Sequence, residues 1–589
     1  MNKIIELTAV TALTIGSITF APPVTAQTKQ PLFLAYPPKV HQTKAERIFL
    51  IGTASPSGEV LINGEAIQRS QAGHFAPSFP LQMGENRFVL RYGKEEITVK
   101  ITRISTEPEI PVGVAFAKNS LTPSKDIARL PDELICFGAI APPNGKVSVR
   151  LGNQNIPLLP QPQSVNLPLN NAVLTSNNRP TSSSVTSQYQ GCTTVSEVGN
   201  LGNPIFQLNL NGKTVIQEGS GKVEILSVTS PEVIEVTAEA GVARTGPSTN
   251  YSRMTPLPKG TKAAVTGKEG DWLRLDYGGW IHKEESQTLV TKIPPKSLIR
   301  SIISQQVIGA TEIIFPLQTP VPVSVNQGDK TFTLTLYNTT AQTDTIRIND
   351  DPIIKRLDWQ QINPTQIQYT FHLKSEQQWG YDLKYEGTSL ILSLRHPPKV
   401  ESQSLSGIKI LLDPGHGGKQ LGARGPTGYP EKDVNLLVSK LLQKEFKKRG
   451  AIVYLTRETD KELSLDERVT MINKLKPTLA LSIHYNALPD NGDAINTAGI
   501  STFWYNSQAH NLSVFLHNYL VEKLNRPSHG VFWNNLALTR PHTAPCVLLE
   551  LGFMINPEEF EWIINPQEQQ KLASAIADGI KEWFEKFQS

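Results

Sequence analysis

The sequence predicts a multidomain protein in which several all-β modules precede one C-terminal α/β domain, whose mixed sheet is flanked by helices. Up to about residue 396, short runs alternate apolar and polar side chains between turn residues, which is typical of β-sandwiches and small barrels. From residue 407 onward, apolar runs alternate with amphipathic stretches whose apolar residues recur every three or four positions. A chain of 589 residues is too long for one core, and its length predicts about three to five domains.

Composition places the chain among ordinary globular proteins, with 39% hydrophobic and 19% charged residues. Its 57 basic and 53 acidic side chains leave a net charge of +4, so we do not expect nucleic acid as a partner. Among the three cysteines, Cys136 and Cys192 fall in one predicted module, and either a disulfide or two free thiols fits them. Cys546 lies in an apolar run and is interpreted as a small buried hydrophobe.

The first 26 residues predict a secretory signal peptide. The stretch "MNKIIELTAVTALTIGSITFAPPVTAQ" has an early lysine, an apolar middle and small residues before a cleavage point after Ala26. An uncleaved membrane anchor is the alternative, but Glu6 and Pro22-Pro23 interrupt the apolar run. We therefore expect an exported protein of the periplasm or cell wall, without stable membrane insertion after cleavage.

Two β-rich modules follow. Residues 32–105 contain the alternating runs "RIFLIGTA", "GEVLING" and "NRFVLRYG", which predict a β-sandwich. This stretch resembles exported bacterial immunoglobulin-like modules. Residues 106–230 contain further strand-like pieces on both sides of "LTSNNRPTSSSVTS", whose composition predicts a flexible loop.

Residues 234–290 combine an "ARTGPS" turn, "LPKGT" and "GDWLRLDYGGWI", and they resemble a bacterial SH3-like barrel. Members of that family often bind cell-wall peptides. Trp272, Tyr277 and Trp280 are therefore candidates for an aromatic wall-binding groove, with the alternative that the tryptophans fill the core of a small barrel. Residues 296–396 resemble the AMIN module, a β-sandwich that attaches cell-wall amidases to peptidoglycan, and 397–406 read as a linker.

The C-terminal domain, residues 407–589, places chemically useful side chains where its predicted strands end. His416 follows "IKILLD", His484 ends "TLALSI", and Glu550 closes "CVLLE". Glu431 opens the helix that follows a glycine-rich loop. Because ligands of α/β sheets bind at the carboxyl ends of the strands, we expect these four side chains at one edge.

Two histidines, one carboxylate and a further carboxylate match the needs of a catalytic zinc, which takes three protein ligands and keeps one position open. Gly415, Gly417 and Gly418 would let the backbone turn sharply beside His416. Taken singly, each residue has a structural interpretation: a hydrogen-bonded core histidine, or a glutamate at a helix start that complements the macrodipole. Four such residues at one edge favour the metal site.

The motifs "LLDPGHGG", "YPEKDVNLLVSKLL", "LALSIHYNA" and "APCVLLELGFMIN" resemble, in order and spacing, the zinc-dependent N-acetylmuramoyl-L-alanine amidases of the amidase-3 type. The resemblance covers about residues 407–586. It implies that His416, Glu431 and His484 hold Zn²⁺ and that Glu550 is the catalytic base. It also implies that the substrate is peptidoglycan, cleaved at the amide between N-acetylmuramic acid and L-alanine.

Further expectations concern the surroundings of this site. We interpret Asp413 as a partner that orients His416, or as a cap of its loop, and Asn486 as a hydrogen-bond partner of substrate or of the site backbone. Arg457 and Arg468 are expected to form structural ion pairs. The short "HYNALPDNGDAINTAGISTFWYN" connection lacks the long insertion of family members held inactive by an accessory helix, so we expect no obligatory activator. The alternatives are a zinc endopeptidase acting within the stem peptide, and a non-catalytic wall-binding scaffold.

Overall fold

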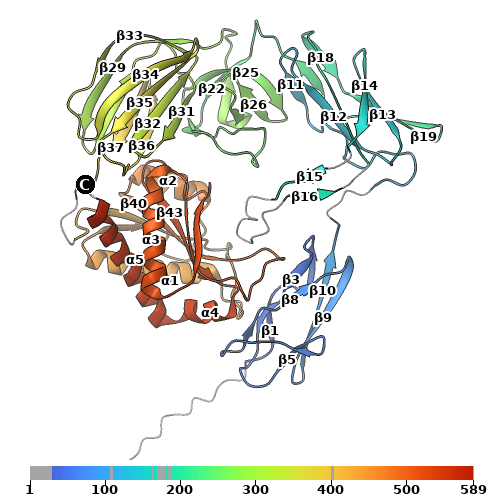
Figure 1. The fold of residues 1–589 in the computed structure, drawn as a ribbon, viewed down its shortest axis with the longest axis vertical. Coiled ribbons are helices and arrows are strands. Elements are labelled where there is room, and N and C mark those ends of the chain that lie inside the picture. The colour runs from blue at the N-terminus through green and yellow to red at the C-terminus, as the bar shows by residue number, and fades with distance from the viewer. Residues whose placement is uncertain are drawn as a thin grey trace, which may run out of the picture.

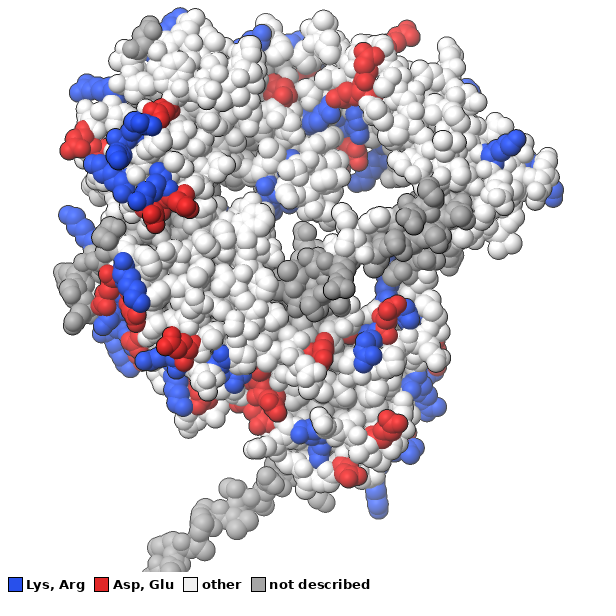
Figure 2. Space-filling model, viewed as in Figure 1, with Lys and Arg blue, Asp and Glu red and all other residues white. Residues whose placement is uncertain are grey.

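The computed structural model describes residues 30–105, 110–161, 164–168, 180–183, 187–399 and 404–587. The expected signal peptide, most of the Ser/Thr-rich stretch and part of the linker lie outside these ranges. The β modules follow one another in an arc, and the C-terminal domain lies between the two ends of that arc (Figure 1). Basic and acidic side chains are scattered among one another over the face drawn in Figure 2. Within the described ranges, no helix combines the length and apolarity needed to cross a bilayer.

The N-terminal module is built from short strands around one apolar core, which includes Phe75, Leu90 and Val99. Its largest sheet has the order β2-β10-β9-β5-β6, and smaller sheets pair β1-β4-β7 and β3-β8. The strands are β1 Phe33–Tyr36, β2 Val40–Thr43, β3 Arg47–Phe49, β4 Ile51–Thr53, β5 Val60–Ile62, β6 Glu65–Ala66, β7 His74–Phe75, β8 Ser78–Pro80, β9 Gly84–Tyr92 and β10 Glu95–Arg103.

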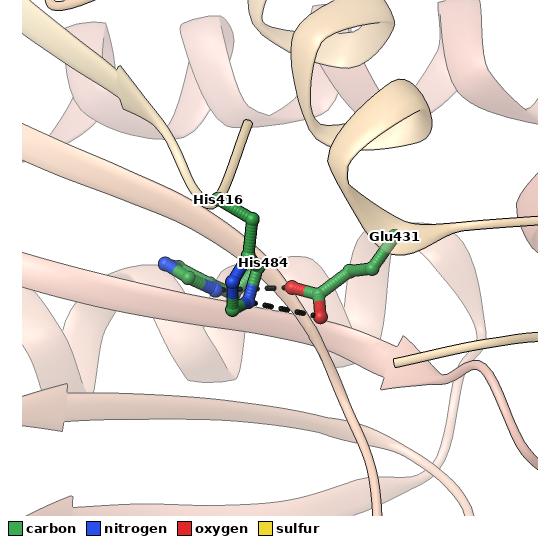
Figure 3. A group of neighbouring side chains, drawn as sticks. All are labelled: His416, Glu431 and His484. Atoms are coloured by element: carbon green, nitrogen blue, oxygen red, sulfur yellow. Dashed lines mark hydrogen bonds and ion pairs between the residues drawn. The ribbon is translucent and has the colours of Figure 1, made fainter. Parts of the chain in front are cut away.

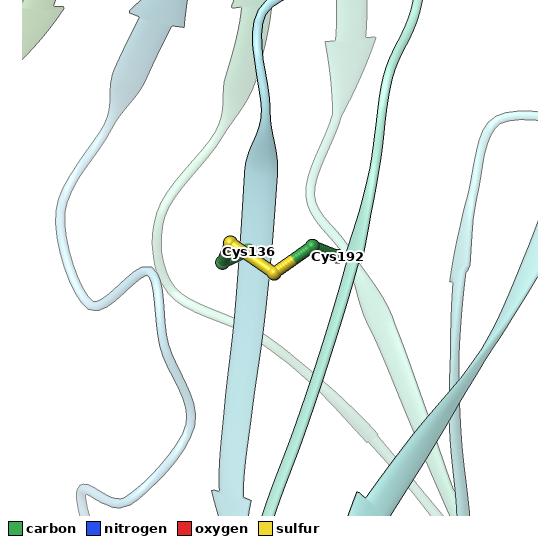
Figure 4. Close-up of a disulfide and its surroundings, with 2 residues drawn as sticks. All are labelled: Cys136 and Cys192. Carbon is green, nitrogen blue, oxygen red and sulfur yellow. A yellow bond between two sulfur atoms is a disulfide. The ribbon is translucent and has the colours of Figure 1, made fainter.

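The second module has a six-stranded sheet with the order β12-β17-β14-β13-β19-β20. Cys136 and Cys192 face each other on the antiparallel strands β12 and β17 and form a disulfide (Figure 4). Of the two states that the sequence allowed, a disulfide or two free thiols, the structure has the disulfide. The strands are β11 Ile127–Arg129, β12 Ile135–Ile140, β13 Lys146–Leu151, β14 Gln154–Pro160, β15 Ser164–Asn166, β16 Thr181–Ser183, β17 Gln188–Thr193, β18 Gly199–Gly202, β19 Ile205–Leu210, β20 Lys213–Glu218 and β21 Val223–Ile225.

The SH3-like barrel shares a sheet with the module before it. Strand β11 pairs with β21 on one side and with β25 of the barrel on the other, so one sheet crosses the expected boundary near residues 230–234. The barrel strands are β22 Val233–Val236, β23 Ala240–Gly241, β24 Leu257–Pro258, β25 Lys262–Glu269, β26 Trp272–Leu275, β27 Trp280–His282 and β28 Ser286–Thr288.

The next module packs two sheets face to face around a core that includes Phe315, Phe332 and Tyr369. The sheet orders are β33-β29-β30-β37-β36 and β31-β32-β35-β34. The strands are β29 Ser297–Val307, β30 Ala310–Phe315, β31 Val323–Gln327, β32 Thr331–Tyr337, β33 Thr339–Arg347, β34 Ile354–Asn363, β35 Gln366–Leu373, β36 Tyr381–Glu386 and β37 Ser389–Arg395.

The C-terminal domain has the mixed sheet and flanking helices that the sequence predicts. The sheet order is β39-β38-β40-β43-β41-β42; the first four strands run parallel to one another, and β41 is antiparallel to β43. The strands are β38 Lys409–Pro414, β39 Ile452–Leu455, β40 Leu479–Asn486, β41 Ile500–Trp504, β42 Ser528–Trp533 and β43 Cys546–Phe553. The helices are α1 Glu431–Lys448, α2 Leu465–Leu475, α3 His510–Leu524, α4 Pro557–Ile564 and α5 Pro566–Phe587.

Two apolar clusters cover the two faces of this sheet. On one face, residues of α1, α3, α4 and α5 pack against Ile410, Leu481 and Leu549. On the other, α2 and the segment 536–544 pack against Leu411 and Leu548. Alternate residues of one strand thus enter different clusters, as a buried strand requires. The carboxyl ends of β38, β40 and β43 consequently lie side by side at one edge.

Candidate metal centre and active site

Strand register places the predicted site residues on three neighbouring strands. His484 of β40 is the Cα partner of Glu550 on β43, and Pro414 of β38 is the partner of Ile483 on β40. His416 follows β38 by two residues. Because parallel strands end at the same edge, side chains far apart in the chain meet there.

The loop at His416 explains its glycines. His416 has φ +60°, a conformation that costs a non-glycine residue energy, and Gly417 and Gly418 also have positive φ. A Cβ on Gly415 would lie 2.2 Å from the ring of His484, so a side chain there would displace that histidine. Gly417 and Gly418 instead leave room for the backbone of residues 461 and 462. Glycine therefore allows close approach at all three positions and, at Gly417 and Gly418, also the turn.

Glu431 occupies the first position of α1 and points into this edge. Its side chain is 4% exposed and accepts hydrogen bonds from the backbone N–H groups of Ala423, at 2.8 Å, and Tyr485, at 3.1 Å. Asn435 Nδ2, one turn further along the helix, donates to Glu431 Oε1 over 3.0 Å. These donors fix both carboxylate oxygens in place.

The structure brings His416, Glu431 and His484 together (Figure 3). His416 Nε2 lies 3.1 Å from Glu431 Oε2, and His484 Nδ1 lies 3.0 Å from Glu431 Oε1. The two imidazole rings are 4.9 Å apart and nearly perpendicular. One nitrogen or oxygen from each residue lies within 4.8 Å of the others, a spacing at which the three can share one cation.

The donor set fits a zinc ion. Two imidazole nitrogens and one carboxylate are a ligand combination of catalytic zinc sites, which keep a fourth position for water or substrate. A Cβ on Gly422 would lie 2.4 Å from Glu431 Oε2 and 2.6 Å from His416 Cδ2, so only glycine lets the loop backbone pack this closely against the two side chains. Burial alone would raise the pKa of Glu431, but hydrogen bonds to both histidines outweigh it and hold that pKa well below its usual range, so the carboxylate is negative.

Glu550 lies beside this trio with one oxygen unsatisfied. It is half-buried, and its Oε2 is shielded from solvent without a protein hydrogen-bond partner. Burial, followed by the negative charge of Glu431, raises the pKa of Glu550 well above its usual value. Two neighbouring carboxylates with opposite pKa shifts are typical of sites in which one holds a charge and the other moves a proton.

Asp413 contacts Arg468 in place of the His416 ring that we expected it to orient. The buried Asp413 carboxylate accepts from Arg468, at 2.6 Å, and from the hydroxyls of Thr456 and Ser482. Arg468 in turn donates to the backbone oxygens of Pro414 and His416, at 2.8 and 2.7 Å. Asp413 thus supports the His416 loop indirectly, through the ion pair predicted for Arg468.

Among the residues that the structure describes, Arg457 does not form the ion pair that we predicted for it. Its guanidinium donates hydrogen bonds to backbone oxygens. Its donors reach Pro414 O at 3.0 Å, Gly415 O at 2.9 Å and Lys432 O at 2.8 Å. Asn486 is buried at the end of β40; its Oδ1 accepts from the N–H of Ala487, and its Nδ2 has no partner among the described residues. That free donor lies two residues beyond His484.

For the aromatic residues of the barrel, the structure favours the packing alternative over a wall-binding groove. Trp280 is buried at 8% exposure, and Tyr277 packs against Tyr337 of the next module with ring centroids 5.0 Å apart. Trp272 is half-buried and meets the ring of His282 edge-on. Two of the three side chains are therefore used in packing: Tyr277 packs against the barrel core and the next module, while Trp280 is buried outside that aliphatic core cluster.

Sequence reasoning missed Asn435, which ties α1 to the loop of the first motif. Besides Glu431, its Nδ2 reaches Gly415 O at 3.3 Å. A signal existed: Asn435 lies four residues after Glu431 and directly after Val434, on the predicted apolar face. A polar residue in such a position is buried and needs hydrogen-bond partners.

No feature of the sequence indicates that the N-terminal module contacts the sheet edge that carries His416, Glu431 and His484. Asp490 accepts from the hydroxyl of Tyr36 and lies 2.9 Å from His41 Nε2. Phe49 and Ile51 share an apolar cluster with residues at and beyond the carboxyl ends of β40 and β43. The cluster consists of Phe49, Ile51, Ala76, Leu488, Ala494, Phe553 and Ile555. This contact joins residues more than 400 positions apart and closes the arc of Figure 1.

Comparison with known proteins gives two family matches. Residues 410–582 match the family described as N-acetylmuramoyl-L-alanine amidase, and residues 241–287 match the bacterial SH3 domain. A probable cell wall amidase LytH from Staphylococcus epidermidis is 32% identical over 220 residues, which cover 37% of this chain and 71% of that protein. A probable cell wall amidase LytH from Staphylococcus aureus is 36% identical over 186 residues, covering 31% of this chain and 61% of that protein.

Among solved structures, the catalytic domain of CwlV, an N-acetylmuramoyl-L-alanine amidase from Bacillus (Paenibacillus) polymyxa var. colistinus, is 30% identical. The match covers 30% of this chain and 98% of that chain, with a TM-score of 0.29. The amidase AmiC2 of Nostoc punctiforme is likewise 30% identical, over 31% of this chain and 99% of its own, with a TM-score of 0.29.

Proposed function

The chain belongs to the N-acetylmuramoyl-L-alanine amidase family, and we propose that it hydrolyses peptidoglycan with a zinc centre held by His416, Glu431 and His484 and with Glu550 as general base. The bond cleaved is the amide between N-acetylmuramic acid and L-alanine. The observation that carries the proposal is the convergence of two histidines and one carboxylate within 4.8 Å at one sheet edge.

The three ligand side chains are prepared to hold a dication. Glu431 brings a negative charge into a buried position, and the backbone donors of Ala423 and Tyr485 keep its oxygens oriented. A zinc ion bound there would polarise the scissile carbonyl and make water a stronger nucleophile at neutral pH.

Glu550 handles the protons. Its shielded Oε2 lacks a protein donor, so it is free to accept the proton of the attacking water. The same carboxyl then returns that proton to the leaving nitrogen of L-alanine, which must be protonated as the amide bond breaks. Positioned acid–base catalysis of this kind contributes about 10²–10⁴-fold to a rate. Asn486 Nδ2 is a candidate donor to the substrate, because it is unpaired in the buried region beyond His484.

The relatives named cell wall amidases support a secreted or wall-associated location for this protein. We extend this to export through the predicted signal peptide and to attachment of the enzyme at the wall by its β modules. We further propose that the purified chain acts without an activator protein.

The test uses purified full-length protein on insoluble peptidoglycan, with metal analysis and mass spectrometry of the products. We expect about one zinc per chain and peptides with a free L-alanine amino terminus, released without added protein. Glu550→Gln should bind zinc but release peptides about 10²–10⁴-fold more slowly. Glu582→Gln, at a partly exposed position of α5, should match the parent. Stem peptides shortened internally would instead identify an endopeptidase, and unchanged peptidoglycan would identify a scaffold.

A further inference from the structure

Three modules line an open cavity away from the sheet edge that carries the metal centre. It has a volume of about 390 Å³ and lies where the SH3-like barrel and the following β-sandwich meet the C-terminal domain. On β41, Ser501 is the Cα partner of Glu550 and Phe503 that of Leu548, so the strand leads away from the site toward the cavity-lining Tyr505. Four residues of strand span about 13 Å. The cavity and the metal centre are therefore separate.

Two arginines from different modules line this cavity, and none of its lining residues is acidic. Arg253 comes from the barrel and Arg540 from the segment before β43. Within the described ranges neither guanidinium has a carboxylate at ion-pair distance, although Asp466 acts on both from outside the cavity lining. Arg540 Nε donates to Leu536 O, and its terminal nitrogens have no acceptor among the described residues. Burial, followed by the positive charges of Arg253 and Arg244, lowers the pKa of Arg540 to about 10, so it remains charged at neutral pH.

An aromatic face stands beside the two arginines. Tyr505 and Trp533 are stacked with ring centroids 5.3 Å apart, and Trp533 is 63% exposed. The indole Nε1–H already donates to Tyr505 O over 2.9 Å, which leaves the ring as an apolar surface. Across the cavity, His542 stacks on Tyr381 at 4.6 Å, and burial lowers the pKa of that histidine, so it adds no positive charge at neutral pH.

These features together fit one class of ligand. Guanidinium groups bind carboxylates through paired, charge-assisted hydrogen bonds, and aromatic faces suit the apolar faces of sugar rings and aliphatic side chains. Besides burial, the positive charges of Arg253 and Arg244 lower the pKa of Arg540 by more than Asp466 and Tyr505, which also act on it, raise it. An anion bound in the cavity would relieve the remaining repulsion. A carboxylate carried on a sugar-linked peptide satisfies both the arginines and the aromatic face.

We propose that this cavity is a second peptidoglycan-binding site, in which Arg253 and Arg540 bind a stem-peptide carboxylate and Trp533 contacts the adjoining apolar part. The proposal rests on the proposed function for the identity of the polymer. A site away from the metal centre would hold one part of the wall while another part is cleaved, because both sites belong to one connected body.

The test measures binding of a soluble muramyl tripeptide to full-length Glu550→Gln, which keeps the probe intact, by calorimetry. Because the active site also binds this probe, the indole N–H signal of Trp533 in nuclear magnetic resonance reports the second site. We expect the probe to shift that signal, and Arg253→Gln with Arg540→Gln to weaken the effect about 10- to 100-fold. A probe with its carboxylates converted to carboxamides should bind as weakly. Lys330→Gln, which removes an exposed lysine outside the cavity, is the matched control.

Several outcomes would overturn the site. These are equal affinity of the arginine variants and the parent, equal affinity of carboxylate and carboxamide probes, or preferential binding of a glycerol phosphate oligomer. In an otherwise wild-type chain, the arginine pair variant should retain turnover of the soluble fragment and the parent unfolding temperature, which excludes misfolding. Failure of the proposed function is distinguishable: the arginine-dependent signal would persist while the parent cleaved no peptidoglycan.

Discussion

The variant Asp413→Asn removes the negative charge of a buried ion pair whose other member, Arg468, holds the backbone of the His416 loop. The side chains of Asp413 and Arg468 are 2% and 3% exposed. Without its partner, the guanidinium stays buried and uncompensated, because its other acceptors are neutral carbonyl oxygens. Breaking a buried pair in this way costs about 3–5 kcal/mol of the free energy of unfolding.

This cost predicts a measurable change in the C-terminal domain. For a domain of this size, 1 kcal/mol shifts the unfolding temperature by about 2–4 °C, so the transition should fall by about 6–20 °C. Differential scanning calorimetry of the full chain is suitable, because the modules are expected to unfold in separate transitions. Loss of support beneath a ligand loop should also lower metal affinity about 10- to 100-fold, measured by competition with a chelator.

Glu582→Gln is the control, because it breaks an exposed pair with Lys586 on α5. Such a pair contributes about 0.3–0.5 kcal/mol, so its transition should move by less than about 2 °C. If Asp413→Asn shifted the transition no more than Glu582→Gln does, the ion pair would not be supporting the loop, and our reasoning about this residue would be refuted.

The same pair gives a pH dependence with a definite sign. Burial alone would raise the pKa of Asp413, but the charge of Arg468 and the hydroxyl donors outweigh it and hold that pKa below its usual value. A depressed native pKa contributes stability that is complete above the unfolded pKa of about 3.9 and is lost as pH falls through the native value. The parent should therefore lose stability below about pH 4 more steeply than Asp413→Asn does. Parallel acid unfolding curves would contradict this.

Four further predictions concern other parts of the molecule. Glu550→Gln should reduce the rate of amide hydrolysis by about 10²–10⁴-fold, with unchanged zinc content and unfolding temperature; a smaller loss would remove Glu550 from the proton-transfer role. Chelation should lower the unfolding temperature of the parent C-terminal domain but leave that of His416→Ala unaffected, since that variant has already lost a ligand. Cys136→Ser should destabilise the second module by about 4 kcal/mol, the loop-closure value for a bridge spanning 56 residues, and calorimetry showing no change would contradict it. Ile51→Asp should detach the N-terminal module by placing a charge in the apolar cluster at the catalytic edge, which small-angle scattering would detect as a larger radius of gyration; an unchanged radius would show that the cluster does not hold the contact.

The C-terminal fold and the meeting of its side chains were largely predictable from local pattern. Apolar runs that end in His416, His484 and Glu550 mark strand ends, and alternation of strands with amphipathic helices makes those strands parallel. Parallel strands end at the same edge of the sheet, so residues that follow different strands in the sequence are expected to lie close together in the structure. The sequence left open whether Cys136 and Cys192 form a disulfide, because residue spacing does not show whether their two strands pair with the cysteines opposite each other.

By itself, the sequence determined which segments form strands and helices and which polar residues stand at their ends, because periodicity and turn chemistry act over a few residues. Only the tertiary structure decided which modules and side chains pack against one another. It gave Asp413 a partner 55 residues away, buried Trp280, packed Tyr277 against the next module and placed the N-terminal sandwich against Leu488 and Phe553. The apolar residues of a face predict that it is buried, but they do not specify which other surface buries it, because hydrophobic contact is non-directional.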